Sequence, residues 1–172
     1  MEVARVRAEE WPELRELRLR ALADSPEAFA STPAREAAFP AQVWRQRAQG
    51  GPASANFLAR ADGVAVGMAA VVAEPVPGRM QLVGMWVDPR HRRRGVAQAL
   101  IGRAVRWSRD HQARELIAWV AEPNTAARSL YARAGFEPDG ARQPLPSNPA
   151  VDELLLRLLL GPGGHPTTRG ER

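Results

Sequence analysis

Three apolar segments follow one another between residues 57 and 87, and they constrain the fold more than any other part of the chain. The segments are residues 57–60, 64–73 and 80–87. Ala61-Asp62-Gly63, a turn sequence typical of β-hairpins, separates the first two, and Pro75 to Gly78 separates the second and third. We therefore predict an antiparallel meander of three strands, which ends at Asp88-Pro89.

The rest of the chain has the spacing of helices, with further strands between them. The expected helices are residues 9–23, 40–48, 95–110 and 124–134. We expect strands at 116–121 and at the leucine-rich 153–160, which would be buried on both faces. Loops are expected at 25–38 and at 138–150, which contains four prolines. This pattern predicts one α/β domain over residues 1–160, a mixed sheet with helices on both sides, and a disordered tail at 161–172.

Composition excludes several kinds of chemistry. The chain has no cysteine, which excludes disulfides, a cysteine nucleophile and zinc-thiolate sites. All 24 basic residues are arginine, so a lysine Schiff base and a GxxxxGK phosphate loop are excluded as well. We favour biased codon composition as the explanation of this arginine preference, although a net charge of +5 also suits an anionic ligand. The three histidines stand apart without metal-ligand spacing, so we expect no metal site.

Neither a membrane span nor a signal peptide is expected. No apolar run approaches the roughly 18 residues that a spanning helix needs. The N-terminus, Met-Glu-Val-Ala-Arg, lacks the apolar region of a secretory signal. We therefore expect a cytoplasmic protein without a membrane partner, either a monomer or a homodimer.

An arginine- and glycine-bearing loop connects the third predicted strand to the next helix. It reads Arg92-Arg93-Arg94-Gly95-Val96-Ala97. Backbone N–H groups at a helix N-terminus bind phosphate, Gly95 permits close approach of a ligand, and arginine makes bidentate phosphate contacts. A solvated basic turn remains open as an alternative. A nucleic-acid-binding patch is less favoured, because no aromatic residues are interleaved with the arginines.

A second motif lies on the predicted helix at 124–134. Asn124 has the type and position of an N-cap, and Gly135 suits the left-handed residue that ends a helix. Tyr131, the only tyrosine, follows seven residues after Asn124 and lies on the same helix face, near Ala127. A capped helix with a half-buried tyrosine would also give this pattern. If the tyrosine faces the arginine-rich loop, however, it could donate a proton to a leaving group.

Together the two motifs resemble those of the GCN5-related N-acetyltransferase (GNAT) superfamily. The loop matches Gln/Arg-x-x-Gly-x-Gly/Ala, and the segment from Asn124 to Phe136 matches Asn-x-x-Ala-x-x-Leu-Tyr-x-x-x-Gly-Phe throughout. The strand end Val87-Asp88-Pro89 is also similar, and the resemblance extends over about 55–139. It implies the acyl-CoA N-acyltransferase fold, an α/β fold with a mixed, mostly antiparallel central sheet of six to seven strands flanked by helices on both faces. It also implies acetyl-coenzyme A as the acetyl donor.

The resemblance further implies a set of site residues. In such proteins the fourth and fifth strands splay apart and the pantetheine arm lies between them. The residues implied to bind acetyl-coenzyme A are Met85, Trp86, Val87, Arg92, Arg93, Arg94, Gly95, Val96, Ala97, Gln98, Asn124, Ala127 and Tyr131. The Val87 N–H would stabilise the oxyanion. Tyrosine, with a pKa of about 10, stays protonated at neutral pH, so Tyr131 would act as the general acid.

The acceptor and the general base are less constrained. We expect an N-acetyltransferase that modifies a primary amine on a small molecule, an amino acid or a peptide N-terminus, without specific nucleic-acid binding. The loops 25–38 and 138–150 would choose the acceptor, with Glu27 and Phe29 as candidate contacts and Glu36 as a further acidic group. Candidate bases are Glu27, Glu74, Asp88 and Glu122, although Asp88 is expected simply to start a turn. A non-catalytic coenzyme A sensor or partner module remains the alternative.

Overall fold

The computed structural model of the protein describes residues 1–161 and places seven strands in one sheet. The sheet order is β1-β2-β3-β4-β5-β7-β6, and every pairing is antiparallel except that of β4 with β5. The strands are β1 Glu2–Arg5, β2 Ser54–Ala61, β3 Val64–Ala73, β4 Arg79–Val87, β5 Glu115–Ala121, β6 Glu137–Leu145 and β7 Asn148–Leu159. This arrangement confirms the mixed, mostly antiparallel sheet and the meander. Apart from its first residue, the expected tail lies outside the described residues.

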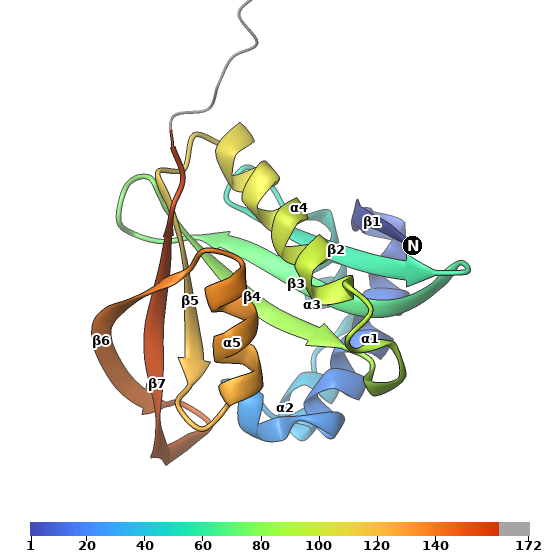
Figure 1. The fold of residues 1–172 in the computed structure, drawn as a ribbon. Coiled ribbons are helices and arrows are strands. Elements are labelled where there is room, and N and C mark those ends of the chain that lie inside the picture. Colours follow the sequence, from blue (N-terminus) through green and yellow to red (C-terminus); the bar gives the residue numbers. More distant parts are fainter. Residues whose placement is uncertain (162–172) are drawn as a thin grey trace, which may run out of the picture.

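Helices cover both faces of the sheet (Figure 1). They are α1 Trp11–Asp24, α2 Pro33–Ala37, α3 Ala41–Gln49, α4 Val96–Asp110 and α5 Thr125–Arg133. Successive β2 residues point to opposite faces, so Phe57 packs in the core under α4 and α5, whereas Leu58 packs in the core under α1. Within the described residues, no helix is long and apolar enough to cross a membrane.

Two expectations about local structure are corrected, and one strand is added. Most of 138–150 belongs to the β6–β7 hairpin rather than to a loop. Pro138 and Pro144 are tolerated because β6 is an edge strand whose register shifts between Pro138 and Arg142 and between Pro144 and Leu145. The segment 25–38 contains the short helix α2, capped by Thr32. The four-residue strand β1 was not predicted, and it forms by pairing with β2.

Candidate functional site

The sheet opens between β4 and β5. These strands pair through three residues each, from Arg79↔Glu115 to Gln81↔Ile117, although both continue beyond that point (Figure 1). A cavity of about 390 Å³ lies in this region. It is lined by residues of β4, β5 and α5, by the segment after α1, and by the β6–β7 hairpin. The splayed strands that the family resemblance implies are therefore present, and they form the candidate site.

The end of β4 directs backbone groups into this opening. The Asp88 N–H donates to the Val66 carbonyl at 2.8 Å, so this residue pair is hydrogen-bonded in the β3–β4 ladder. Because such pairs alternate in an antiparallel ladder, Val87 points its N–H and C=O away from β3, toward the opening. Trp86 lies opposite Met68 and directs its backbone to β3 instead. Met85 lines the cavity, which leaves Trp86 as the residue of the expected trio that does not face the opening.

The loop after β4 has the geometry of an anion-binding turn. Arg93 and Gly95 have left-handed φ values of 60° and 80°, and Gly95 is the N-cap of α4. A Cβ at Gly95 would meet no atom within 4 Å, so the space beside it is open. The N–H groups of the first α4 turn, 96–98, lack intrahelical partners, and the Arg93 and Arg94 side chains are exposed. The loop therefore offers both backbone donors and positive charge to an anion.

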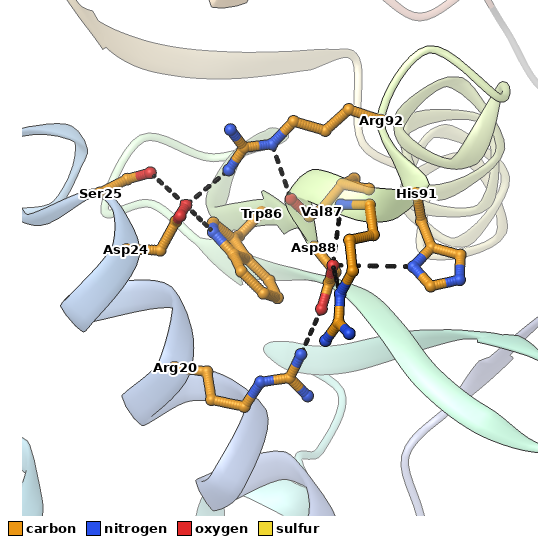
Figure 2. Close-up of polar contacts among 9 residues, drawn as sticks. Arg20, Asp24, Ser25, Trp86, Val87, Asp88, His91 and Arg92 are labelled. Atoms are coloured by element: carbon orange, nitrogen blue, oxygen red, sulfur yellow. Dashed lines mark hydrogen bonds and ion pairs between the residues drawn. The ribbon is translucent and has the colours of Figure 1, made fainter.

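Arg92 has a structural partner, as Figure 2 shows. Its Nε donates to the Val87 carbonyl at 2.9 Å, and its guanidinium lies 2.5 Å from Asp24 Oδ2. The same Oδ2 accepts from Trp86 Nε1 at 2.9 Å and from Ser25 Oγ at 2.7 Å. Hydrogen bonds from Trp86 and Ser25, together with Arg92, hold the pKa of Asp24 below its ordinary value. Rather than pointing freely at a ligand, Arg92 ties the loop to the C-terminal end of α1.

Asp88 starts the turn after β4, as expected. Its carboxylate accepts from the Arg90 N–H at 2.9 Å and also binds Arg20 (Figure 2). Burial alone would raise the pKa of Asp88, but the hydrogen bond from Arg90 and the charges of Arg90 and Arg20 lower it. An ionised, doubly paired carboxylate is a poor proton acceptor, which disfavours Asp88 as a general base.

The Asn124–Tyr131 motif lines the same cavity. Asn124 caps α5, because its Oδ1 accepts from the Ala127 N–H at 3.0 Å, and Gly135 has the expected positive φ of 88°. The Tyr131 ring packs edge-on against Phe136, with 5.2 Å between ring centroids, and only 5% of the residue is exposed. Asn124, Ala127 and Tyr131 all contribute to the cavity wall. Burial raises the pKa of Tyr131 above its ordinary value, so its hydroxyl is protonated at neutral pH.

The expected acidic residues do not reach the cavity. Those proposed as bases, Glu27, Glu74, Asp88 and Glu122, are absent from its described lining. Glu122 is paired with Arg142 at 2.5 Å. Glu36 is buried and paired with Arg18 at 2.8 Å and Arg47 at 2.9 Å, and it is absent from the described lining of this cavity. Phe29, by contrast, lines the cavity, and its carbonyl accepts from Ser147 Oγ at 2.5 Å, which joins the two loops expected to choose the acceptor.

Glu153 lines the candidate site and was not identified in the sequence analysis. It begins the leucine-rich part of β7, lines the cavity and is only 6% exposed. Its Oε1 accepts from Gln143 Nε2 at 2.6 Å. Burial raises the pKa of Glu153 despite the opposing hydrogen bond from Gln143. The available signal was one carboxylate within a strand expected to be buried on both faces. Among residues 1–161, no group of three potential metal ligands is placed to hold an ion.

Comparison with known proteins agrees with the resemblance seen in the two sequence motifs. The acetyltransferase (GNAT) family model matches residues 10–136. Aminoglycoside N(6')-acetyltransferase type 1 of Salmonella typhimurium strain LT2 is 36% identical over 90 residues, which are 48% of this chain and 62% of that protein. The crystal structure of nourseothricin acetyltransferase is 27% identical with a TM-score of 0.59, covering 63% of this chain and 66% of that one. The chain thus spans less than two thirds of either relative's length.

A solved structure that covers more of the chain shows the same fold. The acetyltransferase of the GNAT family from Streptococcus pneumoniae superposes with a TM-score of 0.75. The superposition covers 93% of this chain and 99% of that one, at 19% sequence identity. At this identity the match establishes the fold alone. The sequence motifs, the splayed strands and the overall topology are therefore all consistent with the fold of that structure.

Proposed function

Because this chain belongs to the acetyltransferase (GNAT) family, we propose that it is an N-acetyltransferase that moves an acetyl group from acetyl-coenzyme A to a primary amine. The observation that carries the proposal is the cavity between β4 and β5, with the Asn124–Tyr131 motif on its wall and the anion-binding turn at the end of β4. The donor supplies an acetyl thioester, which is a reactive electrophile toward amines.

The residues around the opening fit such a donor. The first-turn amides of α4, with exposed Arg93 and Arg94, suit a pyrophosphate, and the open space beside Gly95 leaves room for it. Met85, Asn124 and Ala127 line the region where a pantetheine arm would lie. The Val87 N–H faces the opening, where a backbone donor could stabilise an oxyanion. Arg92 contributes indirectly by holding the loop in place.

Tyr131 is proposed as the general acid. Its ring is fixed by Phe136, and burial keeps its hydroxyl protonated at neutral pH. A protonated group beside the cavity can donate to a thiolate as that group departs. The tyrosine would then regain a proton from the newly formed amide nitrogen.

A cationic primary amine is the proposed acceptor. Glu153 places a carboxylate on the cavity wall, which suits a positively charged group, whereas the Phe29 ring is already covered by the Arg18 guanidinium at 4.7 Å. The Salmonella relative is named for acting on aminoglycosides, which carry several amines. We therefore propose small polyamine-like molecules or peptide N-termini as the first acceptors to examine.

Two measurements test the function. Acetyl-coenzyme A should raise the melting temperature by mass action, and calorimetry should give a dissociation constant. A screen of primary amines should then show amine-dependent release of free thiol. The absence of a thermal shift at millimolar ligand with folded protein would refute the proposal. A clear shift without turnover on any amine would favour the non-catalytic coenzyme A-binding module.

A further inference from the structure

The cavity between β4 and β5 contains a carboxylate on the β7 side and a phenol on the α5 side. Glu153 is the single acidic residue among the described residues that line it, and Tyr131 is the single tyrosine. We propose that Glu153 is the general base that removes the proton from the acceptor's ammonium group. The inference rests on the proposed acetyl transfer and adds the residue that activates the nucleophile.

The position of Glu153 is fixed by the sheet. In the register it lies opposite Ala121 of β5 and Gln143 of β6, so both of its neighbouring strands hold the backbone. Gln143 Nε2 binds Oε1 at 2.6 Å, and among the described residues the structure gives Oε2 no comparable donor. One oxygen therefore orients the carboxylate, while the other can receive a proton.

The surrounding charges leave this carboxylate available. Arg18 also lines the cavity: its Nε and Nη2 bind Glu36, and its Nη1 is buried without a hydrogen-bond partner among the described residues, while no ion pair joins it to Glu153 there. Asp152 and Arg142 alternate with Glu153 and Gln143 along their strands and pair with each other at 3.2 Å on the opposite face. Tyr131 on α5 is neutral at physiological pH. Within residues 1–161, Glu153 forms no ion pair with an arginine, unlike Asp88, and burial raises its pKa above the ordinary value, which favours proton uptake.

The proposed step balances as follows. Glu153 takes one proton from the ammonium, and the freed nitrogen lone pair forms a bond to the acetyl carbon. Collapse of the tetrahedral adduct breaks the carbon–sulfur bond, and the sulfur takes a proton from Tyr131. The amide nitrogen loses its second proton to the tyrosinate. Glu153 finally releases its proton to solvent, so the reaction yields an amide, a thiol and one proton.

The test compares Glu153→Gln with Asp152→Asn, which neutralises the adjacent carboxylate on the other face. Glutamine keeps the size of the side chain and an oxygen that can accept from Gln143, but it cannot act as a base. We expect turnover to fall about 10²–10⁴-fold in Glu153→Gln, with acetyl-coenzyme A affinity unchanged. In the parent, activity should fall toward acidic pH as Glu153 becomes protonated, and this fall should be absent in Glu153→Gln. Asp152→Asn should have the turnover and pH profile of the parent. Glu153→Asp should have reduced turnover but should still lose activity toward acidic pH.

Each contrary result has a definite meaning. Parent-like turnover and pH profile in folded Glu153→Gln would overturn the inference while leaving acetyl transfer intact. Loss of acetyl-coenzyme A affinity in step with turnover would show a structural role and would also overturn it. If Glu153→Gln does not fold, Glu153→Asp provides the test. A folded Glu153→Asp variant whose activity does not fall toward acidic pH would also overturn the inference. A parent that neither binds the donor nor acetylates any amine would refute the proposed function itself.

Discussion

Asp24→Asn tests the tie between α1 and the loop that precedes α4. One oxygen of Asp24 accepts from Trp86, Ser25 and Arg92 at 2.9, 2.7 and 2.5 Å (Figure 2). Asparagine keeps the shape of the side chain and a carbonyl oxygen that can occupy the same place. The substitution therefore removes the negative charge while leaving the hydrogen-bond acceptor.

The expected cost follows from these contacts. A hydrogen bond to a charged group contributes about 1.5–3 kcal/mol, compared with about 0.5–1.5 kcal/mol for a neutral one. The side chains of Asp24 and Arg92 are 30% and 46% exposed, so solvent screens their ion pair. Only the Trp86 bond is well buried, since Trp86 is 5% exposed. We expect a loss of about 1–2 kcal/mol in unfolding free energy, or about 2–8 °C in melting temperature for a chain of this length.

Urea unfolding followed by far-UV circular dichroism measures this loss. Asp139→Asn is the matched control, because Asp139 pairs with Arg157 at 3.4 Å far from the loop. The pKa of Asp24 is lowered in the folded state, so its stabilisation is present above the unfolded pKa and is lost as the pH falls through the folded pKa. The difference between parent and Asp24→Asn should therefore narrow in acid.

The same substitution should weaken acetyl-coenzyme A binding, because Arg92 would no longer hold the loop to α1. Calorimetry on parent, Asp24→Asn and Asp139→Asn measures this effect. An Asp24→Asn variant with parent-like stability and donor affinity would refute the idea of a tie. Equal losses in both variants would show a general effect of removing surface charge.

The other predictions concern single residues at the site. Gly95→Val should abolish acetyl-coenzyme A binding. The control Gly63→Val, at a similar φ of 81° and with similarly open space, should only destabilise the fold by about 1–2 kcal/mol. Calorimetry and thermal melts on both variants separate blockage of the ligand from backbone strain. Tyr131→Phe should lower turnover about 10²–10⁴-fold with donor affinity retained, and parent-like turnover would exclude Tyr131 as the acid. Glu153→Gln should be more stable than the parent at neutral pH, because burial raises the pKa of Glu153 in the folded state. That stability advantage should vanish as the pH falls below the pKa of Glu153 in the unfolded chain, where the carboxyl is protonated in both states. Thermal melts of both proteins over a series of pH values measure it, and an advantage that does not change with pH would contradict the prediction.

Features that depend on residues close together in the chain were predictable from the sequence. The meander followed from apolar segments separated by turn residues, and β3 has the bounds expected for it. The caps at Asn124 and Gly135 were recognised because a helix terminus is satisfied by groups within a few residues. The loop through Gly95 was identified in the same way. In each case one short stretch contains both the backbone conformation and the side chain that supports it.

Tertiary structure alone decided which distant residues meet. Asp24 and Arg92 are 68 positions apart, and nothing in either segment indicates that one binds the other. Glu153 was taken as part of a buried strand, and only the order β5-β7-β6 brings it to the cavity that Tyr131 lines. The prolines of β6 were interpreted as a sign of a loop. A strand tolerates them only at the edge of a sheet, and that edge position is determined by the order of all the strands. Local sequence sets periods, caps and turns, whereas burial, ion pairing and proton affinity depend on neighbours that only strand order and register supply.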